Sequence, residues 1–313
     1  MTQLRDVRQG LSLCAYELRK ASEAAARAAF LRLTRPERGP SDDSARLAME
    51  AELIHQGIQA RIVAGPAARL GDPTRLDQWD VVMDPTEGAA CLTQGLTNAM
   101  ACLALAPIGS LFDPGPAFYM EKLVAPPQAA FCLDPTAPVA ERLTALARGL
   151  DKKVSQLTIY VLEKPRHRAL VEAIQAAGAR VALYPAGDVA GAILATMPGS
   201  GIDALMGTGG AAEGLLAACA AKVMGGTFLA RLDPQLTTER RAVDESGLDT
   251  RAWMDLDQLV RSDNVVFCAT GIASGLLLDG IERRDGLERT HSLLVGGGAE
   301  PRQMLTAWHR MEG

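Results

Sequence analysis

Apolar residues recur at helical spacing near the start of the chain. The segment 4–33 is rich in Leu and Ala with Arg and Glu between them, which predicts one long helix. The Pro- and Gly-containing stretch 35–40 ends this helix. Ser41 or Asp42 can then cap a second helix running to Gln56, because a short polar side chain accepts hydrogen bonds from the amides of a first helical turn.

Short apolar runs predict strands in the rest of the first half. Residues 60–64 form one such run, and residues 80–84 form another that ends on an acidic side chain. A loop is predicted at 65–73, between these two strands. Residues 98–108 are apolar throughout and fit either a strand or a packed helix.

Strand-like and helix-like patterns alternate in the second half. The predicted elements are strands at 157–162, 180–184, 202–206 and 265–269, and helices at 166–177, 189–197 and 213–224. The polar segment 233–256 is predicted to be a loop or excursion. This alternation indicates an α/β layered fold, and a length of 313 residues suits one large or two modest domains.

Composition narrows the classes of protein and partner. With 48% hydrophobic residues, the chain can bury a sizeable core without disulfides, and its six dispersed cysteines are expected to be reduced. A formal net charge of −5 argues against nucleic acid as a partner, since phosphate binding needs a basic face. Neither a secretory signal nor a membrane-spanning apolar run is evident, so we expect a cytoplasmic protein with no membrane partner.

The most informative motif is Asp84-Pro-Thr-Glu87-Gly88, which follows the predicted strand at 80–84. A strand end projects Asp84 and Glu87 toward one crevice, where their oxygens suit a hard divalent cation shared with a phosphate. Gly88 lets the backbone come near a ligand. An Asx-type turn after the strand would explain the same residues without any ligand.

A glycine-rich turn lies between the predicted strand at 202–206 and the helix at 213–224. Gly209 and Gly210 belong to this turn, whose amides at a helix N-terminus suit an anion. Glu213 at the helix start could ligate a metal. A simple tight turn, with Glu213 interacting with the helix dipole, would account for the same pattern.

Polar residues also stand at several other element boundaries. Lys164 and Arg166 follow the strand at 157–162, a place suited to a sugar phosphate, although a solvated basic turn is the simpler alternative. The boundaries at 119–123, 187–188 and 261–264 fit either a structural or a functional role.

Taken in order, these motifs resemble the class II fructose-1,6-bisphosphatases of the metal-dependent, lithium-sensitive sugar and inositol phosphatase superfamily. The matching segments are VVMDPTEG, FYMEKL, EKPRH, GDVA, GTGGAAEG and RSDNVVFCATGI. The resemblance is strong from about residue 80 to 295 and looser before residue 75. The resemblance implies that the chain folds as an αβαβα sandwich. It also implies an enzyme of gluconeogenesis that hydrolyses the 1-phosphate of fructose 1,6-bisphosphate, with Mg²⁺ or Mn²⁺ activating the attacking water. Some relatives also accept sedoheptulose 1,7-bisphosphate.

The resemblance also implies two sets of site residues and an oligomer. The metal ligands would be Asp42, Asp84, Glu87 and Glu213, of which Asp84 and Glu87 would also be catalytic. The sugar bisphosphate would contact Tyr119, Lys164, Arg166, Asp188, Gly209 and Gly210. We expect a metal-binding half at 1–145, a sugar-phosphate-binding half at 146–313, and a homodimer or homotetramer.

Three positions depart from the family's pattern. Pro66 stands where a metal-ligating Glu is expected, Ala89 where a Thr orients the attacking water, and Ala186 where an Asp begins Asp-Gly-Asp. Proline and alanine offer no side-chain oxygen, and losing one positioned group commonly costs ~10²–10⁴ in rate. Three functions therefore stay open: the bisphosphatase, a catalytically reduced relative that binds a sugar phosphate, and a phosphatase for another metabolite whose metal site is rebuilt around Asp72 or Asp77.

Overall fold

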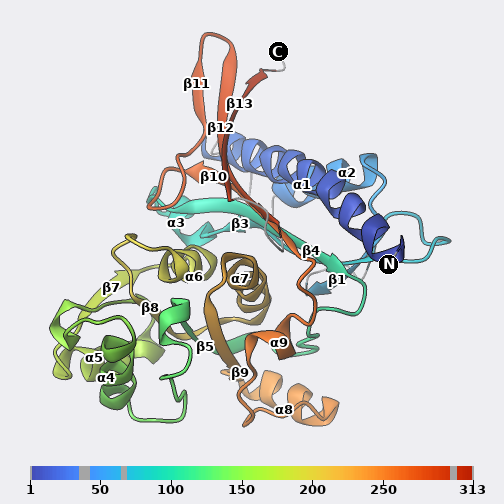
Figure 1. Ribbon diagram of the computed structural model, residues 1–313. Helices are drawn as coiled ribbons and strands as arrows, with labels where there is room; N and C mark the ends of the chain where they lie inside the picture. Colours follow the sequence, from blue (N-terminus) through green and yellow to red (C-terminus); the bar gives the residue numbers. More distant parts are fainter. Residues whose placement is uncertain (1, 35–42, 65–68, 297–301, 312–313) are drawn as a thin grey trace. The chain divides into compact units, whose positions relative to one another are not determined.

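The computed structural model describes residues 2–34, 43–64, 69–296 and 302–311, which form two compact units (Figure 1). The first unit comprises Met1–Leu111 and Ser262–Gly313, and the second comprises Phe112–Arg261. The boundary expected at 145/146 lies inside the second unit, within helix α4 (Val139–Gly149). The division differs because the C-terminal segment returns to pair with the strands of the N-terminal segment.

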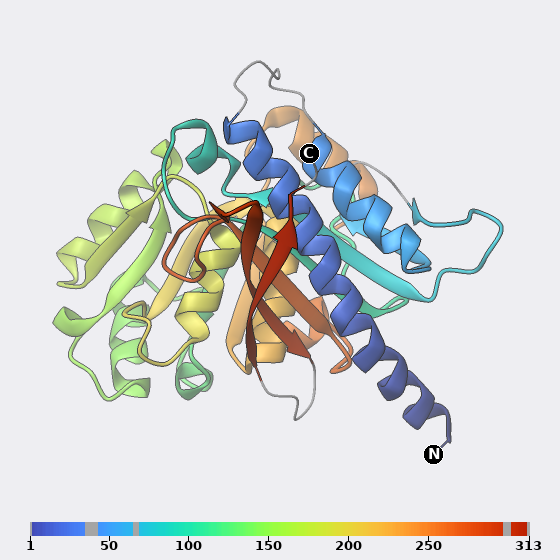
Figure 2. The same cartoon turned by 90° about the horizontal axis from the view of Figure 1, so that it is seen from above.

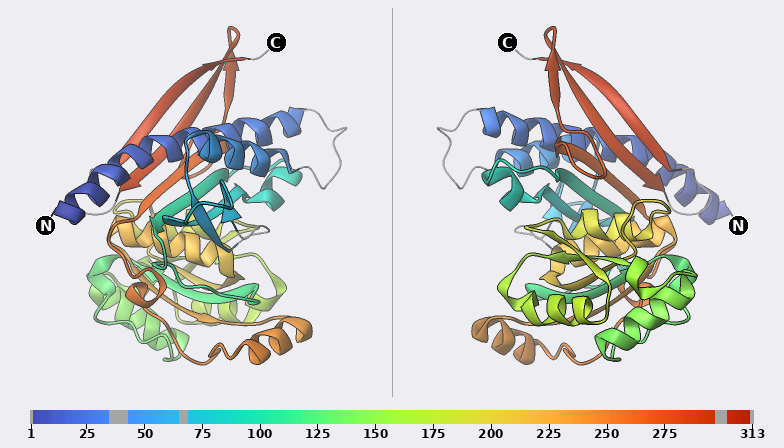
Figure 3. Two further views of the ribbon diagram at one scale, coloured as in Figure 1. Left: turned by 90° about the vertical axis from the view of Figure 1, so that its right-hand side faces the viewer. Right: turned by 90° about the vertical axis from the view of Figure 1, so that its left-hand side faces the viewer.

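The described residues of the first unit form a mixed sheet of eight strands. These are β1 (Ala60–Ala64), β2 (Arg69–Leu70), β3 (Trp79–Glu87), β4 (Ala99–Pro107), β10 (Val266–Ala273), β11 (Glu282–Arg284), β12 (Leu287–Gly296) and β13 (Gln303–Arg310). Their order is β11-β12-β10-β4-β3-β1-β2, and β13 pairs with β12. Within the described part of this unit, β1 and β3 are the one pair of strands that run parallel. Figure 3 shows the red strands β12 and β13 extending beyond helix α1.

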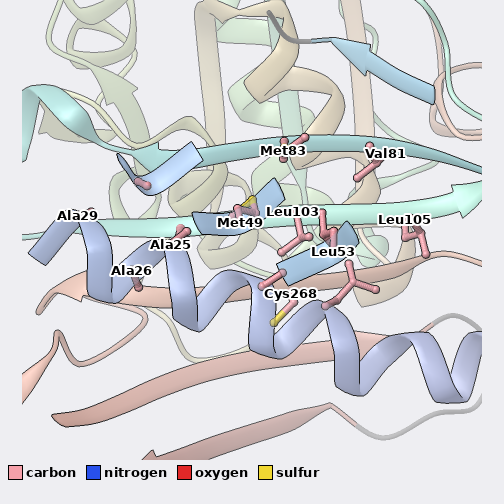
Figure 4. Packing of buried hydrophobic residues seen from close by; sticks show 14 of the residues in the cluster. Ala25, Ala26, Ala29, Met49, Leu53, Val81, Met83, Leu103, Leu105 and Cys268 are labelled. Atoms are coloured by element: carbon pink, nitrogen blue, oxygen red, sulfur yellow. The ribbon is translucent and has the colours of Figure 1, made fainter. Parts of the chain in front are cut away.

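Two helices cover one face of this sheet. Helix α1 (Thr2–Thr34) lies across the sheet beside α2 (Ser44–His55), as Figure 2 shows. Met49 of α2 packs with Val81, Leu103 and Cys268 of three neighbouring strands in one buried cluster (Figure 4). Burial of this apolar surface is the main term that holds the helices on the sheet.

The second unit has a five-stranded sheet between two helical layers (Figure 1). Its strands are β5 (Tyr119–Ala125), β6 (Thr158–Leu162), β7 (Arg180–Tyr184), β8 (Ala204–Gly210) and β9 (Thr227–Leu232), in the order β7-β6-β8-β5-β9. Strands β7, β6 and β8 are parallel, whereas β5 runs antiparallel to β8 and β9.

The helices of the second unit divide between the two faces of its sheet. Leu143 of α4 and Ile174 of α5 (Arg168–Ala176) share a buried cluster with one face. On the other face lie α6 (Asp188–Thr196) and α7 (Ala211–Met224), where Gly191 abuts Tyr160. The other helical segments of this unit are η1 (Pro127–Ala129), η2 (Val154–Gln156), η3 (Pro165–His167), α8 (Thr237–Ser246) and α9 (Leu256–Leu259), and the first unit has the short helix α3 (Ala89–Thr93).

These layers confirm the predicted α/β fold class and supply the components of an αβαβα sandwich. The ambiguous run at 98–108 is a strand, β4, which is buried along almost its whole length. The prediction of a loop or excursion at 233–256 is wrong for Thr237–Ser246, which form α8, and α9 begins at the last residue of this segment. Among the described residues, no helix is both long and apolar enough to cross a membrane.

Candidate active site

The first unit contributes two of the predicted site carboxylates, both on β3. The strand continues past Asp84 to Glu87, with an irregular register between them: Asp84 lies opposite Cys102 and Glu87 opposite Met100. Asp84 accepts a hydrogen bond from the Thr86 amide at 3.0 Å, so the Asx-type turn predicted as an alternative is present. Glu87 is only 3% exposed. The turn therefore holds two carboxylates on a short stretch of backbone.

Gly88 is required by the geometry of this turn. It has φ +80°, and a Cβ placed there would lie 2.7 Å from the backbone oxygen of Asn98. Asn98 itself has φ 74° and is 8% exposed, and its Nδ2 atom has no hydrogen-bond partner among the described residues. Ala89 follows as the exposed first residue of α3 and brings a methyl group where the resemblance leads one to expect a hydroxyl.

The chemistry of these side chains suits a hard cation, although only part of the expected ligand set can be placed. Carboxylate oxygens are the ligands that Mg²⁺ prefers. Asp42 and Pro66 lie outside the described residues. Within the described ranges, no three Asp, Glu, His or Cys side chains are grouped as a metal site. Burial, together with the charges of Glu87 and Asp84, raises the pKa of Cys102, which keeps this neighbouring thiol neutral.

The two carboxylates considered as replacements both have local partners. Asp72 accepts hydrogen bonds from the amide and hydroxyl of Thr74, at 2.9 and 2.7 Å, and these bonds lower the pKa of Asp72. Asp77 forms an ion pair with Arg69 at 2.8 Å. These contacts explain both acids as parts of the surface loop.

The second unit gathers other predicted residues around the end of β8. A Cβ on Gly209 would lie 1.9 Å from a carboxylate oxygen of Asp188, and one on Gly210 would lie 1.7 Å from a carboxylate oxygen of Glu213. Glycine therefore lets both acids approach the backbone of this turn. Asp188 begins α6 and Glu213 lies in the first turn of α7, where a negative charge is favourable.

Lys122, a buried lysine that was not among the predicted site residues, connects Asp188 to the backbone of Gly210. Lys122 is only 2% exposed, and its ammonium group pairs with the carboxylate of Asp188. The same ammonium donates a hydrogen bond to the backbone oxygen of Gly210 at 2.9 Å. A charged residue within the apolar strand Tyr119–Ala125 was the signal that could have found it, since a lysine is rarely buried without a partner.

Tyr119 and Arg166 meet beside the same turn. The Arg166 guanidinium lies 5.0 Å from the centroid of the Tyr119 ring, a cation–π contact. Its Nε atom donates to the backbone oxygen of Thr208 at 3.0 Å. Tyr119 pairs with Gly210 across β5 and β8. Lys164 is partly exposed at the start of η3, two residues before Arg166.

His167 connects the basic segment 164–166 to the glycine turn at 207–210. Its Nδ1 atom lies 2.7 Å from the Leu162 oxygen, and its Nε2 atom accepts a hydrogen bond from the Thr208 amide at 2.8 Å. This pair of contacts assigns the proton to Nδ1 of a neutral ring. Burial lowers the pKa of His167 and so favours the same neutral form. A Cβ on Gly207 would lie 2.9 Å from Nε2, so glycine gives the ring room.

The comparisons with known proteins agree along almost the whole chain. The family model described as "Bacterial fructose-1,6-bisphosphatase, glpX-encoded" matches residues 12–309. The "Fructose-1,6-bisphosphatase 1 class 2" of Escherichia coli (strain K12) is 35% identical over 321 residues, with 95% of this chain and 95% of that protein covered. The "Fructose-1,6-bisphosphatase class 2" of Shigella flexneri shows the same identity and coverage.

Proposed function

Because the chain belongs to the family of glpX-encoded bacterial fructose-1,6-bisphosphatases, we propose that it hydrolyses the 1-phosphate of fructose 1,6-bisphosphate. The observation that carries this proposal is the family match from residue 12 to 309, which spans the site segments of both units. Sedoheptulose 1,7-bisphosphate is a second substrate of the same chemical class. The reaction places the protein in carbohydrate metabolism, at the step of gluconeogenesis that removes this phosphate.

The second unit would hold the sugar bisphosphate. Arg166 is exposed and oriented by Thr208, and the terminal nitrogens of its guanidinium fork can bind a phosphate in bidentate fashion. Lys164 would add a second positive charge. Tyr119 would contact the sugar beside Arg166, and the amides of the turn at Gly209 and Gly210 would face the phosphate.

Asp188 would act on the sugar from a fixed position. Its buried pairing with Lys122 holds the carboxylate against Gly209. A carboxylate held in this way accepts hydrogen bonds from sugar hydroxyls without first reorganising. Ala186 stands where the family has the first Asp of Asp-Gly-Asp. Its backbone oxygen accepts a hydrogen bond from the Tyr160 hydroxyl at 3.2 Å.

The hydrolytic step would depend on Asp84 and Glu87. Together with Glu213, and with Asp42 from outside the described residues, they would hold Mg²⁺ or Mn²⁺ through carboxylate oxygens. When bound, such a cation lowers the pKa of a coordinated water and stabilises charge on the phosphoryl oxygens. Asp84 and Glu87 are the catalytic residues of this proposal, since they would hold the cation at the reacting phosphate.

A catalytically reduced relative is the second candidate, and Ala89 is the observation that favours it. The structure places this methyl group at the first position of α3, directly after the carboxylate turn. Such a chain would bind a sugar phosphate and release little or no phosphate from it. The re-formed metal site around Asp72 or Asp77 is less well supported, since both acids have local partners.

We also propose a cytoplasmic homodimer or homotetramer without nucleic-acid or membrane partners. The net charge of −5 supports the absence of a nucleic-acid role. Light scattering coupled to size-exclusion chromatography would measure the number of subunits, and a monomer at micromolar concentration would contradict the oligomer.

The function is tested by phosphate release from fructose 1,6-bisphosphate with Mg²⁺ or Mn²⁺. We expect metal-dependent release by the wild-type chain, loss of release in Asp84→Ala, and wild-type release in Asp77→Ala. Binding of the sugar bisphosphate without release would favour the catalytically reduced relative. Loss of activity in Asp77→Ala, with activity kept in Asp84→Ala, would favour the re-formed metal site.

A further inference from the structure

Glu239 is a buried carboxylate far from Tyr119 in sequence that contacts its backbone directly. It lies in the first turn of α8 and is 1% exposed. One carboxylate oxygen accepts hydrogen bonds from the amides of Phe118 at 2.7 Å and Tyr119 at 2.9 Å. The other accepts from the amides of Gln235 at 2.9 Å and Leu236 at 3.3 Å. Four backbone donors therefore converge on one side chain.

The segment that carries Glu239 also holds the carbonyl side of Tyr119. The Asp233 amide donates to the Tyr119 oxygen at 3.0 Å. The Asp233 carboxylate accepts from the Thr208 hydroxyl at 2.6 Å. Since Thr208 also accepts a hydrogen bond from Arg166, the segment 233–239 contacts Tyr119 directly and is linked to Arg166 through Thr208.

The charge of Glu239 suits this task better than a neutral side chain would. Hydrogen bonds to an ionised acceptor are stronger than those between neutral groups. A glutamine in its place would offer one oxygen to one pair of amides and turn its own N–H groups toward the other pair. One pair of donors would then lose its acceptor in a buried place, which is unfavourable.

We propose that Glu239 is a positioning residue for Tyr119, which fixes the first residue of β5 beside Gly210 and Arg166. The effect on substrate rests on the proposed function, in which Tyr119 contacts the sugar bisphosphate. The anchoring itself is a property of the ligand-free chain and can be measured separately.

The anchoring is tested by hydrogen–deuterium exchange of the ligand-free full chain. In Glu239→Gln, we expect the amides of Phe118 and Tyr119 to exchange about ten-fold faster or more, as local opening becomes easier. Glu245→Gln, an exposed change on the same helix, is the matched control and should leave both amides unchanged. Glu239→Asp, which keeps the charge on a shorter side chain, serves if the glutamine variant does not fold. Unchanged exchange in the folded variants would overturn the proposal.

The effect on the site is tested by steady-state kinetics and by calorimetric binding of fructose 1,6-bisphosphate. Glu239→Gln should raise KM and Kd about ten-fold while kcat stays within about two-fold of wild type. In a Tyr119→Ala background the same change should add no further loss, because its effect runs through Tyr119. An equal loss in that background would show a general structural role and overturn the proposal. A wild-type chain that neither binds nor hydrolyses the sugar bisphosphate would remove the proposed function, and the exchange experiment would still decide the anchoring.

Discussion

The carboxylate turn of the first unit (84–88) and the glycine turn of the second unit (207–210) are held by different contacts. Asp84 and Glu87 come from one stretch of β3, and the Asx-type bond to Thr86 spans two residues. The turn at the end of β8 is instead contacted by Lys122 and His167, which come from elsewhere in the sequence. The proposed binding side is thus held by buried contacts from distant parts of the sequence, and the proposed hydrolytic side combines its local bond with the pairing of β3 on β4.

The departures from the family's pattern fall unevenly on the two units. Pro66 and Ala89 belong to the first unit, whereas the second unit has one departure, Ala186, and retains its other expected polar residues. Since Asp84 and Glu87 are the proposed catalytic residues, a substitution of either is expected to change turnover while leaving binding in place.

The largest effect is expected from Glu87→Gln. Removing a carboxylate from the proposed catalytic pair should lower kcat by ~10²–10⁴ while KM changes little. Glu282→Gln, an exposed change on β11, is the control and should keep wild-type kinetics. Phosphate release under saturating metal measures both, and a kcat unaffected by Glu87→Gln would break the contrast between the two turns.

Lys122→Met should chiefly affect stability. It leaves Asp188 buried without its ionic partner, and breaking such a pair costs about 3–5 kcal/mol. Lys222→Met is the matched control, since its partner Asp257 is exposed and the expected loss is under about 1 kcal/mol. Chemical denaturation would measure both, and the double variant Lys122→Met/Asp188→Asn should recover much of the loss. Equal stability of Lys122→Met and wild type would show that the network does not brace the binding side.

Ala89→Thr should improve turnover if the first unit is indeed the limiting side. The substitution restores a hydroxyl at the exposed start of α3, where it needs no repacking. We expect kcat to rise about ten-fold with KM unchanged, which is less than the ~10²–10⁴ that a fully positioned group supplies. A matched Ala90→Ser change, one residue further along α3, should have no effect. A lower kcat in Ala89→Thr would argue that this turn has adapted to alanine.

The smallest effect is expected from the titration of His167. Because burial lowers its folded-state pKa below the ordinary value of 6.5, the unfolded chain binds this proton more readily. The stabilising contribution is therefore complete above pH 6.5 and is lost as the pH falls toward the folded-state pKa. His167→Gln, which keeps an acceptor for the Thr208 amide, should flatten the fall in melting temperature between pH 7.5 and pH 5 relative to wild type. Identical slopes would contradict this assignment.

The sequence predicted those elements whose apolar pattern is regular. The helix expected at 4–33 is found at Thr2–Thr34, and the strand at 60–64 is found as expected. Strand β5 was missed because a buried lysine interrupts its apolar residues. Strand β12 was missed because Glu288, Thr290 and Ser292 point inward, which hides the usual alternation. Helix α8 buries only Glu239 and Val243, so its surface pattern is that of a polar loop.

The candidate site shows where sequence reasoning stops. Asp84, Glu87 and Glu213 stand in recognisable motifs at element boundaries, and the resemblance assigned them roles. Lys122 and Glu239 stand in no such motif. Asp188 lies 66 residues from Lys122 in sequence and Phe118 lies 121 residues from Glu239, so only the fold reveals these contacts. Supporting residues of this kind depend on tertiary structure and leave little local signal.

Calorimetric titration of fructose 1,6-bisphosphate into metal-chelated protein tests most directly whether binding and hydrolysis belong to different units. The variants are Asp84→Asn from the first unit and Arg166→Ala from the second, compared with wild type in the same buffer. The account predicts that Asp84→Asn binds within about three-fold of wild type while Arg166→Ala binds at least about ten-fold more weakly. Equal loss of binding in both variants would contradict this account, because the carboxylate turn would then be part of the sugar-binding site.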